Sequence, residues 1–194
     1  MMKNLCRDNI FTNFIYSAEL SIPAAEVYEG CLQLKQNHAN AENSNRNGWQ
    51  SPGFNSDAPL PIFTELNNQV IEFANTVSAS EQLGAQFRVA NWWANINDAG
   101  AYNVVHSHPG TDLAVIYYPK VSAKSGNLML VRNDSALSSS LFNNKRQELI
   151  FPLQPQAGRA YAFPAWFLHY VEPSQDEECR VSVAFNLCVD GGVN

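Results

Sequence analysis

Three of the four histidines in this chain fall into one spaced pattern: His106 and His108 stand two residues apart, and His169 follows much later. Only His38 lies outside it. Two histidines at positions i and i+2 of an extended segment project to the same side of a strand, and imidazole is the commonest metal ligand. A third imidazole from a distant strand would complete one face of a coordination sphere, and Arg180 could hold a carboxylate nearby. This donor set suits a non-haem iron centre with open positions for an organic acid and dioxygen.

The composition limits the size of the protein and the classes of partner. With 194 residues, 45% of them hydrophobic, the chain can bury one sizeable core, so we expect a single domain over residues 1–194. The formal charge is 12 − 18 = −6 and there is no basic tract, which argues against nucleic acid and anionic membranes as partners.

The sequence also bears on cellular location. Residues 1–16 lack the apolar stretch of a signal peptide, and no run approaches the roughly 18 apolar residues of a membrane-spanning helix. The four cysteines show no CxxC spacing, and four in a chain of this length do not indicate a disulfide scaffold. We therefore expect a soluble, cytoplasmic protein with reduced thiols.

The elements that must position the histidines fall into two parts, a helical one to about residue 80 and a strand-rich one over about 85–190. Apolar residues recur at helical spacing from Ser21 to Lys35, which predicts a helix with Ser21 as its cap and Pro23 in its first turn. A second helix is expected over about residues 62–78. The segment between them, 37–61, is rich in Asn, Ser, Gly and Pro and is interpreted as a long loop.

After Gly84, short stretches rich in β-branched and aromatic residues alternate with Gly, Pro and Asn turns. The expected strands are 86–96, 102–108, 113–118, 127–131, 159–163 and 180–189. Helices followed by many strands predict helices packed on one side of a β-sandwich or barrel. On the last strand Arg180, Ser182, Ala184 and Asn186 share one face. That polar face could point to solvent, or it could line a cavity if the apolar face packs beneath the helices.

Taken in order, these residues resemble the 2-oxoglutarate- and Fe(II)-dependent dioxygenases, and in particular a bacterial and phage branch of oxygenases of about 200 residues. The resemblance runs from the loop 43–51 to Leu187. Its segments are 93–96, Gly100, Asn103, 106–109, 116–118, 125–128, 163–169 and 180–186. It implies a mainly β fold, a double-stranded β-helix or jelly roll with the N-terminal helices backing one sheet.

The resemblance also implies a metal site. His106 matches the histidine of the family's HxD or HxE motif, His169 matches the distal ligand, and His108 falls where the family carries a carboxylate. Three-histidine sites support oxygen chemistry in some cupin-type dioxygenases, so the departure does not exclude activity. Asp112 is the alternative third ligand, although it lies off the HxD spacing; otherwise it is a solvated turn residue.

The cosubstrate residues follow in the same way. Arg180 matches the basic residue that pairs with the far carboxylate of 2-oxoglutarate, Ser182 completes an RxS arrangement, and Tyr118 falls where related hydroxylases place a tyrosine against that carboxylate. A guanidinium fork with one or two hydroxyls would give a buried carboxylate charge-assisted, directional partners.

Further residues are candidates for the substrate pocket. Trp93 and Trp166 are first interpreted as core or rim aromatics, but their positions beside the metal strands make them candidates for pocket walls. Asn95 and Asn103 could orient substrate or cosubstrate, or could serve turns and strand ends. The loop 43–51 could be a lid or a surface Ω-loop.

These observations favour an iron- and 2-oxoglutarate-dependent dioxygenase that hydroxylates a small molecule or peptide and releases succinate and carbon dioxide. Two alternatives remain open at this point: a three-histidine, cupin-like dioxygenase that uses no 2-oxoglutarate, and a jelly-roll binding module without turnover. The sequence does not identify the prime substrate, the metal bound in the cell, or the oligomeric state.

Overall fold

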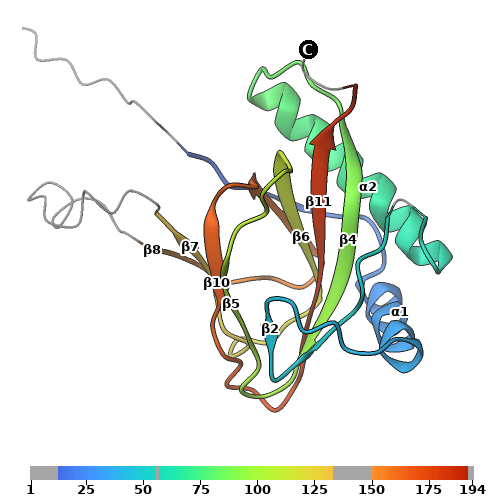
Figure 1. Ribbon diagram of the computed structural model, residues 1–194, viewed down its shortest axis with the longest axis vertical. Coiled ribbons are helices and arrows are strands. Elements are labelled where there is room, and N and C mark those ends of the chain that lie inside the picture. Colours follow the sequence, from blue (N-terminus) through green and yellow to red (C-terminus); the bar gives the residue numbers. More distant parts are fainter. Residues whose placement is uncertain (1–12, 56, 133–149, 192–194) are drawn as a thin grey trace, which may run out of the picture.

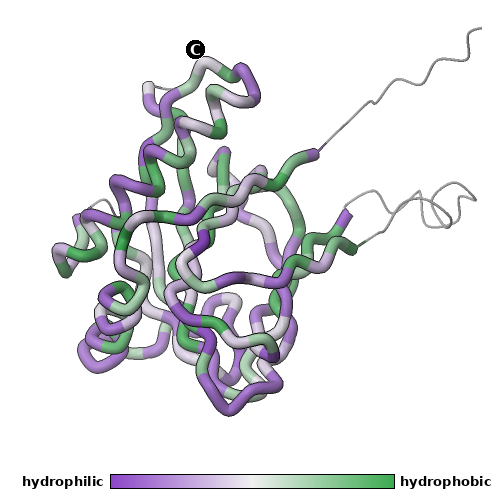
Figure 2. The backbone as a smooth tube through the Cα atoms, turned by 180° about the vertical axis from the view of Figure 1, so that it is seen from behind, coloured by the Kyte–Doolittle hydropathy of each residue, from purple (hydrophilic) through white to green (hydrophobic). Residues whose placement is uncertain are grey.

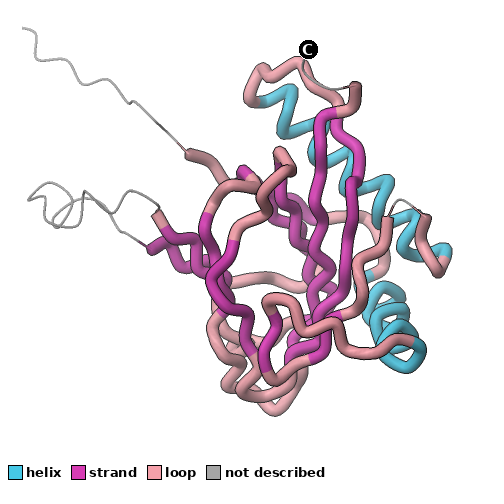
Figure 3. Tube along the Cα trace, in the orientation of Figure 1, coloured by secondary structure: helices cyan, strands magenta, loops and turns pink. Residues whose placement is uncertain are grey.

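The computed structural model describes residues 13–55, 57–132 and 150–191. Two antiparallel sheets face each other, and two helices cover the outer face of the larger one (Figures 1 and 3). This arrangement confirms the expected class, a jelly roll with helices backing one sheet.

Within the described residues, six strands form the larger sheet and five form the smaller one. In spatial order the larger sheet holds β1 (Tyr16–Glu19), β9 (Arg159–Pro164), β6 (Leu113–Lys120), β11 (Arg180–Val189), β4 (Phe87–Asn97) and β3 (Trp49–Gln50). The smaller sheet holds β2 (Asn45–Arg46), β5 (Tyr102–His106), β10 (Leu168–Val171), β7 (Leu128–Val131) and β8 (Ile150–Leu153). All six strands predicted from sequence are present, whereas β1, β2, β3, β8 and β10 are additional.

The first helix, α1 (Ala24–Asn37), begins later than its sequence pattern predicts. The expected cap at Ser21 is wrong, because Pro23 is the N-cap residue and no side chain caps the helix. Pro23 has φ −64°, and its carbonyl accepts hydrogen bonds from the amides of Glu26 and Val27. The ring therefore fixes the backbone conformation at the point where the helix starts.

The second helix, α2 (Pro61–Ser80), confirms the predicted one to within two residues. Its apolar stripe, which includes Phe63, Leu66, Val70 and Phe73, is buried against the larger sheet. In Figure 2 the turns of the helix alternate between hydrophilic and hydrophobic colours as they pass from solvent to sheet. Among the described residues, no helix is long and apolar enough to cross a membrane. Cys31, Cys179 and Cys188 are free thiols, while Cys6 lies outside the described residues.

Strand β11 separates two environments. Val181, Val183, Phe185 and Leu187 belong to the core beneath the helices. Alternate residues point the other way and line the space between the sheets, where the sequence pattern had allowed either a cavity or solvent. The polar face of this strand therefore lines a cavity.

Strand β4, next to β11, changes phase part-way along. Val89 packs beneath the helices, and so do Trp92 and Ala94 further on. With strict alternation Val89 would lie on the opposite face from Trp92 and Ala94, so the strand must contain one extra residue, a β-bulge, between them. The register with β11 shifts between Asn186 and Leu187, which places this bulge next to Val89. Beyond it, Asn91, Trp93 and Asn95 face the inside of the sandwich.

The segment 37–61 is not the simple loop expected from its composition. Strand β2 pairs with β5 of the smaller sheet, and β3 pairs with β4 of the larger one, so this segment joins the two sheets. Asn45, Trp49, Gln50 and Ser51 are buried. The hypothesis of a surface Ω-loop over 43–51 is therefore wrong, since this segment pairs with strands of both sheets and four of its side chains are buried.

Candidate active site

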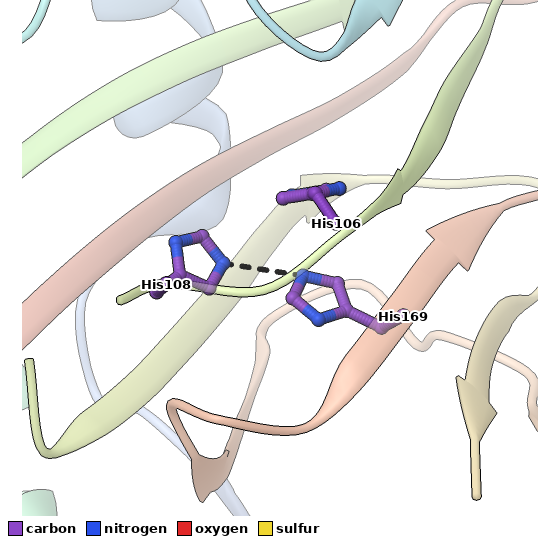
Figure 4. Close-up of side chains that lie close together, drawn as sticks. All are labelled: His106, His108 and His169. Atoms are coloured by element: carbon purple, nitrogen blue, oxygen red, sulfur yellow. Dashed lines mark hydrogen bonds between the residues drawn. The ribbon is translucent and has the colours of Figure 1, made fainter. Parts of the chain in front are cut away.

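Three imidazoles converge between the sheets (Figure 4). His106 ends β5, His169 lies opposite it on β10, and His108 follows two residues after β5 ends. Their ligand atoms all lie within 4.8 Å of one another. Nε2 of His108 is 3.2 Å from Nε2 of His169, the contact drawn as a dashed line in Figure 4.

The backbone sets the orientation of two of the rings. Nδ1 of His106 donates to the carbonyl of Val104 at 2.7 Å, and Nδ1 of His169 donates to the carbonyl of Phe167 at 2.9 Å. When Nδ1 carries the proton, Nε2 presents its lone pair, which is the arrangement seen in metal-binding histidines. In the absence of metal, His108 Nε2 can donate to His169; a cation would replace that hydrogen bond.

Burial also favours the neutral form of the three imidazoles, which is the form that binds metal. Desolvation, and after it the nearby His106 ring, lowers the pKa of His169 to about 3 and that of His108 to about 4. Burial lowers the pKa of His106 as well. All three imidazoles are therefore neutral at pH 7, as metal ligation requires.

Asp112, the alternative third ligand, lies elsewhere. It is exposed, and its carboxylate accepts a hydrogen bond from the amide of Val189 at 2.8 Å, at the end of β11. Its own amide donates to the carbonyl of Leu187. In the described part of the chain, the three histidines form the only cluster of His, Cys, Asp or Glu side chains close enough to share a metal ion.

A small cavity on one side of the triad, called the inner cavity below, is lined by Arg180, Tyr118 and Ser182 together with the three histidines. Arg180 is 2% exposed, and its NH1 donates to the carbonyl of Ser125 at 2.6 Å and to that of Glu172 at 3.4 Å. Gly126 makes this turn possible: its φ is +80°, and an added Cβ would approach the Glu172 carbonyl to 2.5 Å. No carboxylate pairs with Arg180 among the described residues. An unpaired buried guanidinium indicates a site for an anion.

Two hydroxyl side chains share this inner cavity with Arg180. Tyr118 is 1% exposed, and burial raises its pKa to about 12 although the charge of Arg180 acts in the opposite direction. Its phenol therefore stays protonated and can donate. Ser182 lines the same cavity and lies opposite Asn95 in the strand register. The cavity is small, about 30 Å³, so a bound dicarboxylate must displace side chains that line it.

Asn95 and Asn103 lie in the inner cavity too, within a network of buried amides. Asn45 Nδ2 donates to Oδ1 of Asn95 at 3.3 Å and to Oδ1 of Asn97 at 2.6 Å. Asn97 Nδ2 in turn donates to Oδ1 of Asn103 at 3.2 Å. These bonds run from the β2 segment through β4 to β5 and so connect the two sheets. The structure thus gives both candidates a structural role and a position in the cavity.

The two tryptophan candidates have different positions. Trp93 lines the cavity, and its ring centroid is 5.6 Å from that of His108. Trp166 is 54% exposed and stacks on Phe167, and it lines neither of the cavities beside the triad. Trp166 is close to His169 in sequence but not at the cavities, because the side chain of Trp166 points outward from the turn before β10.

A second, open cleft of about 450 Å³ lies on the other side of His106 and His108. Sequence reasoning did not assign Gln50, Asn91 or Asn186 to a site, yet all three line this cleft. The alternation of the last strand placed Asn186 on the same face as Arg180 and Ser182, but no role was predicted for it. The positions of Gln50 and Asn91 depend on the pairing of β3 with β4 and on the β4 bulge, which leave no clear sequence pattern.

Residues 91–186 match the family described as "Putative 2OG-Fe(II) oxygenase". This segment carries the three histidines and Arg180. The chain belongs to the 2OG-Fe(II) oxygenase family. The oxygenase is therefore an oxidoreductase of a family that uses Fe(II) and 2-oxoglutarate.

Solved structures support the fold. A prolyl-4-hydroxylase from Pseudomonas putida superposes with a TM-score of 0.65 at 14% identity, covering 90% of this chain and 93% of that one. A prolyl hydroxylase from Trichoplax adhaerens, in complex with a hypoxia inducible factor peptide fragment, gives 0.65 at 17% identity over 92% and 84%. The α-ketoglutarate-dependent epimerase SnoN from nogalamycin biosynthesis gives 0.69 at 12% identity over 91% and 76%. No curated protein sequence matches this oxygenase.

Proposed function

We propose that this oxygenase is an Fe(II)- and 2-oxoglutarate-dependent dioxygenase that hydroxylates a small-molecule or peptide substrate. His106, His108 and His169 would hold Fe(II). Arg180, Ser182 and Tyr118 would bind the far carboxylate of 2-oxoglutarate. Bound together, the two supply an oxidation in which dioxygen, 2-oxoglutarate and a C–H bond give succinate, carbon dioxide and a hydroxylated product.

One observation supports the proposal most strongly: a buried Arg180, which pairs with no carboxylate of the described residues, shares a cavity with three neutral imidazoles. A buried guanidinium is stabilised when it donates hydrogen bonds to a bound carboxylate, and neutral imidazoles can bind a divalent cation. The cavity thus combines a cationic group that suits a carboxylate with three neutral imidazoles that suit a divalent metal ion.

The remaining residues position the reactants and exclude water. The protonated Tyr118 hydroxyl donates to the carboxylate, and Ser182 offers a second hydroxyl. Leu128, Phe163 and Ala184 form the apolar core between the sheets. Such surroundings keep bulk water from the reacting groups and strengthen the charged contacts within them.

Incubation with Fe(II), ascorbate and 2-oxoglutarate tests the proposal. We expect slow succinate release without a prime substrate, and we expect the release to be lost in Arg180→Leu. Oxygen consumption without succinate would favour the three-histidine, cupin-like dioxygenase, which the absence of a carboxylate from the triad makes the second candidate. Absence of both, with metal bound, would favour a binding module.

A further inference from the structure

The open cleft beside the metal triad is lined by uncharged side chains. Four of them are carboxamides, those of Asn43, Gln50, Asn91 and Asn186. No Asp, Glu, Lys or Arg is among the described residues that line it. The cleft contrasts in this respect with the inner cavity, which contains Arg180.

Two of these lining residues have an amide oxygen that finds no hydrogen-bond partner among the described residues. Gln50 is only 3% exposed, and its Oε1 is both buried and unpartnered. The same holds for Oδ1 of Asn186. A buried acceptor without a donor is costly, so few remain in native proteins unless a ligand supplies the donor. Both atoms therefore indicate a ligand that carries N–H or O–H groups.

The neighbouring asparagine pair narrows the chemistry further. Asn186 Nδ2 donates to Oδ1 of Asn91 at 2.9 Å, and the bond is not reciprocated, since Oδ1 of Asn186 is unpartnered. The pair thus has one oxygen and one NH₂ group left over, whichever of the two amides donates to the other. A group with a donor and an acceptor side by side matches both, and an amide is such a group.

Charged ligands fit less well. A carboxylate would place its oxygens against the free oxygens of Gln50 and Asn186, where nothing compensates for lost hydration. An ammonium would find no anionic partner among the described lining residues. Trp93 adds a flat apolar surface next to His108, with 5.6 Å between ring centroids.

Resting on the proposed function, we infer that this cleft binds the prime substrate and that the substrate presents an uncharged amide group there. Its N–H faces Gln50 and the Asn91–Asn186 pair, and its flat face lies against Trp93. The C–H bond to be oxidised would then extend toward the triad, since His106 and His108 line both the cleft and the inner cavity.

Ligand-observed NMR on the full chain tests whether the cleft prefers an uncharged amide. Three small probes are compared: the neutral N-acetylglycine methylamide, N-acetylglycine, which carries a carboxylate, and glycine methylamide, which carries an ammonium. We expect the neutral diamide to bind at least about tenfold more tightly than either charged probe. Mn(II)-loaded protein, compared with the Zn(II) form, should broaden the signals of the bound diamide, because the cleft adjoins the triad.

Two variants and a control locate the site. Gln50→Met keeps the length of the side chain but removes the acceptor, and it should weaken diamide binding about fivefold. Asn186→Asp should shift the preference toward the ammonium probe. The control Gln36→Met, at an exposed position of α1, should change neither the affinity for the diamide nor the preference among the probes. Thermal melting would show whether the variants remain folded.

Equal or tighter binding of N-acetylglycine would overturn the inference, as would an unchanged affinity in a folded Gln50→Met variant. Binding that Mn(II) does not broaden, in protein that holds the metal, would place the diamide elsewhere and have the same consequence. Probe binding to the metal-free protein and 2-oxoglutarate binding, measured by calorimetry on the same preparation, separate this inference from the proposed function. If 2-oxoglutarate fails to bind while the diamide binds through Gln50, the proposed function fails alone.

Discussion

The two faces of strand β11 differ in what they contribute. Its outer face, with Val183 and Phe185, packs beneath the helices in a core made of apolar side chains. Its inner face carries Arg180, Ser182 and Asn186 into the space that holds the histidines. Burial is nearly complete at Val183, Phe185 and Arg180, yet it stabilises the fold at the first two and costs free energy at the third unless an anion is present. The outer face of β11 therefore contributes stability, and the inner face contributes the groups available for binding.

The largest expected effect is on the inner face. His169→Ala should abolish stoichiometric Fe(II) binding, a loss greater than the 10- to 100-fold typical of outer-shell partners, because a direct ligand is removed. The fold should persist, since the ring contributes little to the helix-covered core. Calorimetric titration with Fe(II) under anaerobic conditions measures the effect. His38→Ala, which removes the histidine outside the triad, is the control; one tight equivalent retained in His169→Ala would contradict the assignment.

On the outer face, Phe185→Ala should reduce the free energy of unfolding by about 3–5 kcal/mol, because a large buried ring is replaced by a cavity. Phe185 is 1% exposed, and its ring centroid lies 6.3 Å from that of Trp92. Urea denaturation measures the change, and Phe185→Leu should lose much less. The folded fraction should still bind metal; a variant of full stability that had lost its metal would reverse the roles of the two faces.

Arg180→Leu should affect the cosubstrate with little effect on metal. Removing a charge-assisted contact to a buried carboxylate costs roughly 2–5 kcal/mol, about 30-fold to several thousand-fold in affinity. Calorimetry of 2-oxoglutarate with the Mn(II) form measures it, and Arg88→Leu, an exposed arginine on β4, serves as the control. An unchanged affinity would remove Arg180 from the proposed site.

The smallest effect is expected for His108→Asp, which restores the carboxylate of the wider family. Aspartate is shorter than histidine, so Fe(II) affinity should fall modestly. The charge-transfer band of the 2-oxoglutarate complex should shift, because a neutral ligand becomes an anion. Absorption spectroscopy under anaerobic conditions measures the shift, and Asp112→Asn should leave the band in place. An identical spectrum with unchanged affinity would put His108 outside the coordination sphere.

Much of the fold could be predicted because it depends on local periodicity. The stripe of α2 and the alternation of β11 are set by residues a few positions apart, and both were predicted. Short strands such as β2, β3 and β10 were missed, since two to four residues carry too little pattern and form only by pairing with a partner strand. The prediction of Ser21 as the cap was wrong because the local sequence offers two possible start points, and the helix begins after Pro23.

The sequence by itself determined the chemistry that this oxygenase can offer, because residue type and order fix three imidazoles, one guanidinium and a tyrosine hydroxyl. Tertiary structure decided which of them meet. Pairing of β5 with β10 brings His106 opposite His169, and the turn at Gly126 supplies the carbonyl that holds Arg180. The β4 bulge turns Asn91 inward, and Gln50 is buried where β3 pairs with β4. These placements depend on strand register over long sequence separations, which local residue patterns do not encode.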